Sequence, residues 1–354
     1  MLAELAVILV ILVTVTFIYL KGTVIKAFLL LINTLVAATV AFAYFETLGR
    51  LIIGYGLVVE WAFAAVLILI FALVLAILNA VGGKLVPADI YFGDFSDRVI
   101  RCLIAAFAGL AIAGVILTAV AMMPIGTKWP YERFIATASN PTEPEKTLIL
   151  SADGFITSVS SWLSRGSMSG QKSLAVFHPD LLNEIYLNRI GCDKDNSAVA
   201  GESAISVETA WTPQTELISA SDNQPISGGS QTKAVVVRAR TNGAFSMSQV
   251  RLVCKESDSA GNLTGSGEVR RPVGYITREN IVDRKSLSEK VTLSQLDFVF
   301  YIPTDTVPVM LQFKQNAVAS VGRLVSSDKT PPPQTPAQQP PTQQTPAEQN
   351  STQQ

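Results

Sequence analysis

The sequence has little charge: only 16% of its 354 residues are Asp, Glu, Lys or Arg, and the net charge is −1. Soluble domains average about 25% charged residues. Without a basic excess the chain lacks the electrostatic footprint of a nucleic-acid-binding protein, so no nucleic-acid partner is expected. The deficit is local, because residues 1–123 hold almost all the long apolar runs. Two such regimes predict at least two structural units.

Histidine and cysteine are almost absent as well. His178 is the single histidine, and the three cysteines have no clustered partners, so neither a metal site nor a cofactor is expected. A Ser–His–Asp triad could be assembled from His178, Asp222 and Ser266, but the surrounding residues resemble no protease segment. We therefore expect no catalytic residue. Ser266 is predicted to lie in a hairpin turn, and His178 to cap the helix that follows it.

Four apolar runs are long enough to cross a bilayer. A hydrocarbon core about 30 Å thick needs about 20 helical residues, and the qualifying runs are 2–20, 27–45, 57–81 and 99–123. The sequence therefore predicts a four-helix transmembrane domain over residues 1–123. The first run contains Glu4 and no basic residue before it, unlike a cleaved signal peptide. Small residues in the fourth run favour close helix packing, within the bundle or at a homo-oligomer interface.

The distribution of Lys and Arg between the loops predicts the orientation. The first loop has Lys21 and Lys26, the third has Lys84 and Arg98, and the second has only Arg50. Loops rich in Lys and Arg stay in the cytoplasm. Both termini are therefore expected outside the cytoplasm, which makes the soluble part a periplasmic domain.

Two short motifs flank the predicted helices: Lys21-Gly22 after the first, and Asp97-Arg98 before the fourth. With the helix layout, they resemble the colicin V production protein (CvpA) family over about a third of the chain. The glycine that the family places soon after Asp-Arg is missing here. The resemblance implies a bacterial inner-membrane protein linked to colicin V production, a toxin biosynthetic process, or to integrity of the cell envelope. Some relatives carry a trypsin-like serine protease on the outer side, after the same four helices.

The same four residues are candidate anchor or docking positions. Asp97 or Ser96 could cap the fourth helix, because an oxygen there accepts from free backbone N–H groups. Arg98 could pair with Asp94 or with a lipid phosphate. We expect Lys21, Gly22, Asp97 and Arg98 to act either as plain interface anchors in the lipid bilayer or as a loop that docks a partner.

The remainder of the chain divides by composition. Residues 124–144 predict a linker, 145–202 a short helical segment, 203–326 a β-sandwich-like domain and 327–354 a disordered Pro/Gln/Thr tail. Apolar residues alternate over 205–211, 250–254, 296–302 and 307–313, which is typical of strands. The last two runs, joined by a four-residue turn, predict a β-hairpin. The fold class is therefore membrane all-α plus a mainly-β domain with short helices.

Two cysteines in the soluble part raise the question of a disulfide. Cys254 is in phase with Val250 and Leu252 and should face the core, and Cys192 follows the Gly191 helix stop. If this domain lies in an oxidising periplasm, a Cys192–Cys254 bond has a reason to form. Two unpaired thiols are the equal alternative.

The sequence indicates no chemical reaction, so only the broad class of function can be predicted from it. The leading hypothesis is a non-enzymatic membrane scaffold whose outer β-domain binds an unknown envelope protein or cell-wall component. A channel or export component is the first alternative, and a membrane-anchored hydrolase is the second.

The Lys/Arg pattern generates a topology prediction. A reporter that is active only outside the cytoplasm, such as alkaline phosphatase, should be active when fused after Gln354. Fluorescence from a cytoplasm-only reporter at the same position, with an inactive phosphatase fusion, would reverse the orientation.

Overall fold

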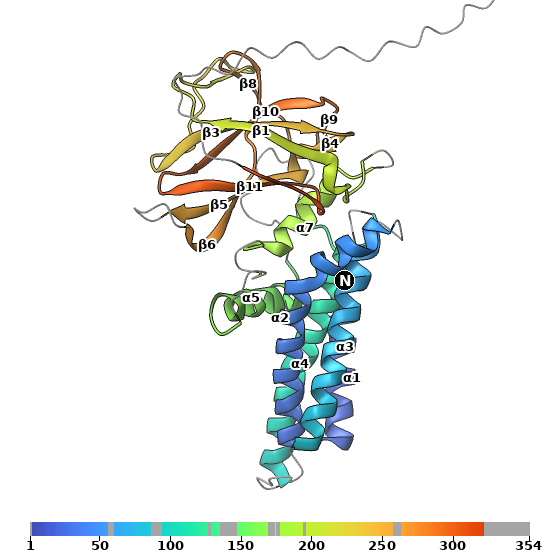
Figure 1. Ribbon diagram of the computed structural model, residues 1–354. Helices are drawn as coiled ribbons and strands as arrows, with labels where there is room; N and C mark the ends of the chain where they lie inside the picture. Colours follow the sequence, from blue (N-terminus) through green and yellow to red (C-terminus); the bar gives the residue numbers. More distant parts are fainter. Residues whose placement is uncertain are drawn as a thin grey trace, which may run out of the picture.

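The computed structural model describes residues 2–55, 60–85, 94–126, 129–134, 147–168, 174, 178–193, 196–257 and 263–321. An apolar helical bundle carries a β-rich domain at one end (Figure 1). The predicted fold class, a membrane helical part followed by a mainly-β soluble part, is therefore confirmed. The predicted tail, 327–354, lies outside the described residues.

Within the described part of the chain, four helices are long and apolar enough to cross a membrane: α1 Leu2–Lys21, α2 Val24–Gly54, α3 Ala62–Leu85 and α4 Asp94–Met122. Two of them are longer than the apolar runs predict. The backbone of α2 continues past Phe45 to Gly54, and α4 begins at Asp94 instead of Val99. Ser96 and Asp97 therefore lie inside the first turns of α4, and their predicted capping role is wrong.

Small and amide residues hold the bundle together. Gly109 of α4 faces α1, where a Cβ would lie 2.9 Å from the Cα of Ile11. Asn33 of α2 donates to Asn79 of α3 at 2.8 Å. Alanines such as Ala37 and Ala111 are fully buried where the helices meet. Close packing through small residues, which the sequence predicts, is thus present within the bundle.

The soluble part is built from two main sheets. The six-stranded sheet has the order β1-β3-β10-β7-β8-β2, the four-stranded sheet the order β12-β11-β5-β6, and β4 pairs with β9. Phe298 of β10 and Phe313 of β11 both pack against Phe245 of β4, so the core lies between the main sheets. The strands are β1 Ile205–Trp211, β2 Ile218–Ser219, β3 Thr232–Thr241, β4 Phe245–Ser246, β5 Val250–Ser257, β6 Leu263–Arg270, β7 Gly274–Arg278, β8 Ile281–Asp283, β9 Lys290–Val291, β10 Gln295–Pro303, β11 Thr306–Phe313 and β12 Ala317–Ser320.

The predicted hairpin of residues 296–302 and 307–313 is wrong. β10 pairs with β3 and β7, whereas β11 pairs with β5 and β12 in the other sheet. The turn after Pro303 is therefore a corner that carries the chain between sheets. Both strands carry a row of large apolar side chains, and the two rows bury each other best across the sandwich. Ser266 also differs from expectation, because it lies within strand β6 and not in a turn.

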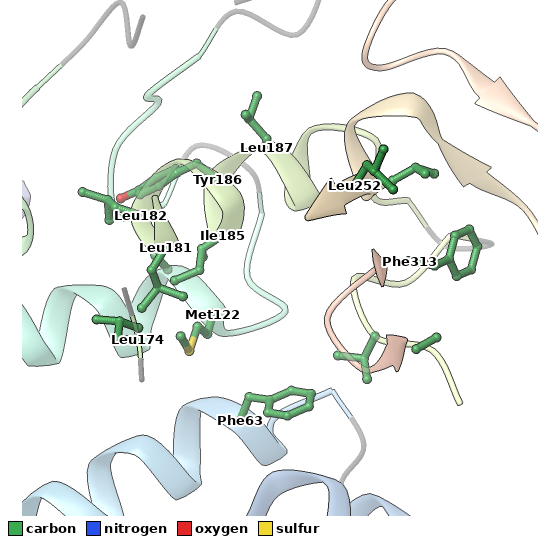
Figure 2. Close-up of a cluster of buried hydrophobic side chains, with 14 of the residues drawn as sticks. Phe63, Met122, Leu174, Leu181, Leu182, Ile185, Tyr186, Leu187, Leu252 and Phe313 are labelled. Carbon is green, nitrogen blue, oxygen red and sulfur yellow. The ribbon is translucent and has the colours of Figure 1, made fainter. Parts of the chain in front are cut away.

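Between the bundle and the sheets the described residues form the helices α5 Ala152–Arg165 and α7 Leu181–Ile190. The α7 helix is buried on nearly all sides, as expected for a helix enclosed between two bodies. Figure 2 shows Leu181 and Ile185 of α7 pointing toward Met122 of α4, with Leu252 of β5 nearby. Bundle, α7 and sandwich therefore share one apolar core.

Gly109→Val tests the contact of α1 with α4. The added methyl groups would meet the backbone of Ile11 and the side chain of Thr14, so we expect a loss of about 1–3 kcal/mol. Thermal unfolding of the detergent-solubilised protein measures it. Gly83→Val is the matched control, because a Cβ at Gly83 meets nothing within 4 Å. Equal melting temperatures for the two variants would contradict the close approach.

Candidate functional site

A group of buried charges joins the bundle to the β-domain. It consists of Glu46 from α2, His178 just before α7, Glu184 from α7 and Arg251 from β5, and we call it the charge cluster. Residues from three distant parts of the chain meet here. This junction of the apolar bundle with the soluble domain, where charged side chains pair with one another in a buried setting, is therefore the candidate functional site.

His178 lies between two carboxylates. Its Nε2 is 3.1 Å from Oε1 of Glu46, and its Nδ1 is 2.8 Å from Oε2 of Glu184. Burial alone would lower the pKa of His178, but attraction to Glu46 and Glu184 outweighs it and raises the pKa to about 9. The imidazole is therefore a cation near neutral pH, with both N–H groups donated to carboxylates.

Arg251 completes the charge balance. Its Nη1 pairs with Glu184, and its Nη2 donates to Oε1 of Gln312 on β11. Nη2 also lies 2.8 Å from Nδ1 of His178 and donates to it in the neutral tautomer, so Nδ1 has the carboxylate of Glu184 and the guanidinium of Arg251 as alternative partners. Burial would raise the pKa of Glu184, yet Arg251 and His178 hold it below its ordinary value. Two carboxylates thus face two cations, and the charge cluster is formally neutral.

Several hollows reach the charge cluster. One of about 30 Å³ is lined by Phe45, Met122 and Arg271 together with the cluster itself. Two larger ones, of about 90 and 220 Å³, are also lined by His178. Burial lowers the pKa of Arg271 to about 10, and its Nη1 donates to the carbonyl of Ser248 at 2.6 Å. In the described residues no group of three His, Cys, Asp or Glu side chains is arranged to hold a metal ion.

A second buried arginine secures the end of α4. Arg189 of α7 donates to four backbone carbonyls, those of Ala121, Ile125, Gly126 and Trp129. These oxygens lie at and beyond the C-terminus of α4, where carbonyls lack helical partners and the helix dipole is negative. Arg189 therefore fastens α7 to the bundle independently of the charge cluster.

The predicted anchor residues lie at the opposite end of the bundle. Arg101 of α4 donates to the carbonyl of Gly22 at 2.9 Å and lies 3.7 Å from the carboxylate of Asp97. The structure thus brings Gly22 and Asp97 together through Arg101, a residue that the motif does not include. Lys21 and Arg98 are exposed, and the pairing of Arg98 with the Asp94 side chain lies outside what the structure describes.

Of the two alternatives for Cys192 and Cys254, the structure has the unpaired one, because both residues are free thiols. Cys192 lies beside Gln249, whose Nε2 is 3.4 Å from its sulfur. Cys254 lies five residues after Gln249, which at the rise of a strand is about 16 Å away. A disulfide needs its two Cα atoms within about 7 Å, so Cys254 is too far from Cys192. Cys254 faces the core, as predicted. Burial raises the pKa of Cys192 to about 11 and that of Cys254 to about 12.

Glu46, Glu184, Arg251 and Arg189 were not among the functional residues predicted from the sequence. His178 was predicted to cap a helix, whereas the structure places it in the charge cluster. The available signals were weak: a carboxylate near the end of an apolar run and an isolated histidine. No protein-family model matches the chain, and neither a curated protein nor a solved structure matches it.

The raised pKa of His178 predicts how stability depends on pH. A folded-state pKa of about 9 against 6.5 in the unfolded chain gives a stabilisation of about 3 kcal/mol, complete below pH 6.5 and lost as pH rises through 9. Thermal unfolding of the detergent-solubilised protein between pH 6 and 10 measures this loss.

Two variants make the pH experiment specific. His178→Gln should unfold at a lower temperature at pH 6 and should lack the decline with pH. Arg240→Gln removes an exposed ion pair with Glu208 and should keep the decline. A decline of the same size in His178→Gln would assign the pH dependence to other groups.

Proposed function

We propose that the protein is a non-enzymatic scaffold of the bacterial inner membrane whose β-domain binds an envelope protein or cell-wall component. The observation that carries the proposal is the charge cluster, which unites α2, α7 and β5 in one buried junction. A tethered binding module needs only a flexible linker. A scaffold has to hold its binding domain in a defined position, and the junction supplies this.

The charge distribution supports an outer location for the β-domain. The end of α1 and the start of α4 lie at the bundle end that is far from the β-domain (Figure 1), and these segments carry Lys21, Arg98 and Arg101. The positive-inside rule assigns such an end to the cytoplasm. The contacts of Ala3 with Ala152 keep the N-terminal end of α1 on the β-domain's side, in accord with an even number of spans.

The channel alternative has less support. Charged residues are absent from the centres of the spans, and the two amides there, Asn33 and Asn79, bond to each other. The hydroxyls of Thr34, Thr39 and Thr118 donate to carbonyls of their own helices. Polar groups in the bundle are therefore engaged in packing, whereas an ion path needs them to face a passage.

The hydrolase alternative also has less support. A general base needs a free ring nitrogen within reach of a nucleophile. Both ring nitrogens of His178 face carboxylates, and its raised pKa favours the protonated form. The link to colicin V production or envelope integrity rests on the CvpA-like layout alone, and it enters here as the proposed setting.

Complementation and cross-linking test the proposal. A strain that lacks the gene should become sensitive to detergent, the full chain should restore resistance, and residues 1–123 alone should not. Photoreactive residues scanned over exposed β-domain positions such as Arg240 should give a discrete adduct, whereas one at lipid-facing Leu9 should not. Ion flux through purified proteoliposomes, or labelling of the folded protein by a fluorophosphonate, would overturn the scaffold.

A further inference from the structure

Most of the buried side chains of helix α5 are small or polar, whereas Trp162 is exposed. The buried residues of α5 are Ala152, Asp153, Ile156, Thr157, Ser160, Ser161 and Ser164. On the outside, Ile149 just before the helix and Trp162 within it are 88% and 72% exposed. A helix that faces water has the opposite arrangement. Leaving such side chains in water forgoes about 1.5–3 kcal/mol each, so the outer face calls for an apolar environment.

Hydrogen bonds prevent α5 from rolling over to bury that face. Asp153 is buried and accepts from the Tyr131 hydroxyl at 2.6 Å. Arg133 donates to the same hydroxyl at 3.2 Å and to Asn183, beside Glu184 in α7, at 2.6 Å. Turning the apolar face inward would break this network and bury unpaired polar groups, which is costly. The outward direction of Trp162 is therefore built into the fold.

The height of α5 along the bundle matches the edge of the bilayer. The 20 residues of α1 span about 30 Å, which is the thickness of the hydrocarbon core. The first turns of α1, at Ala3 and Val7, share a small core with Ala152 at the start of α5. Figure 1 shows α5 lying across the bundle beneath the β-domain. Helix α5 thus begins where the apolar length of α1 ends.

The outer face of α5 is continuous with the lipid-facing surface of the spans. Phe155 packs on Phe107 of α4 with ring centroids 6.5 Å apart, and Phe107 is itself half exposed among apolar residues. Trp162 and Arg165, both exposed, combine an apolar body with a polar tip. Such side chains favour the headgroup boundary of a membrane.

We propose that α5 is an interfacial helix: Trp162 on its outer side, together with Ile149 and Leu150 of the turn that precedes it and the partly exposed Phe155, is embedded in the bilayer leaflet on the β-domain's side. Amphipathic interfacial helices lie in the membrane plane with their apolar face about 5–10 Å into the headgroup region. Because Asp153 and Arg133 connect α5 to α7, this contact also sets the height of the β-domain above the membrane.

Trp162 provides the test, because its fluorescence reports contact with brominated lipid. A variant that keeps only Trp162, with Trp61, Trp129 and Trp211 changed to Phe, is reconstituted in phosphatidylcholine vesicles. We expect it to lose most of its fluorescence with lipid brominated near the top of the acyl chains. The loss should be smaller with lipid brominated near the chain ends, and aqueous iodide should quench weakly.

A variant that keeps only Trp211, which lies on β1 and packs against Arg238, is the control and should not respond to either lipid. If the triple variant does not fold, the wild-type chain is compared with Trp162→Phe. The difference between their quenching by brominated lipid is then the contribution of Trp162. Trp162 fluorescence unaffected by both brominated lipids would overturn the proposal. Strong iodide quenching would then mean an open face, and weak quenching a second protein surface covering it.

Discussion

The burial of His178 between Glu46 and Glu184 is the constraint on which the rest of the structure depends. Each of these groups is costly to remove from water alone, and only the complete arrangement with Arg251 offsets the loss of hydration. Apolar contacts such as those of Leu181 and Ile185 supply area at the junction but little direction, because hydrophobic burial is non-directional. We infer that the charges select one seating of the β-domain among those that the apolar surfaces allow.

The length of α2 agrees with this placement of the β-domain on the bundle. The 31 residues of α2 exceed what a bilayer core requires. Glu46 lies 22 residues after the start of α2, about 33 Å at helical rise, which is slightly more than the thickness of a bilayer core. Arg189 acts at the same height, on carbonyls that follow α4. Helix α7, buried on nearly all sides, is the element that transmits both contacts to the sandwich.

Local sequence patterns predicted the helices and strands whose burial is visible in their own sequence. Long apolar runs gave the four spans, and alternation placed Cys254 in the core of the β-domain. Contacts between distant segments were beyond reach, because nothing near Glu46 in the sequence indicates that His178 and Arg251 will approach it. The hairpin was wrongly predicted for the same reason, since a tight turn between two strands cannot tell pairing in one sheet from crossing to another. The inverted polarity of α5 likewise depends on what the neighbouring helices offer.

His178, the only histidine of the chain, is suited to keeping its charge and not to sensing pH. A histidine that reports pH keeps its pKa near 6.5, so that its charge changes within the ordinary range. In this junction the two carboxylates raise the pKa of His178 to about 9, while Arg251 and His178 hold that of Glu184 below 4.5. Between those limits His178 and Glu184 both keep their charge. In the proposed orientation the β-domain experiences the pH of the surroundings, and a junction whose groups titrate on either side of neutrality keeps the β-domain in place while that pH varies. The arrangement therefore fits a fixed mount better than a switch.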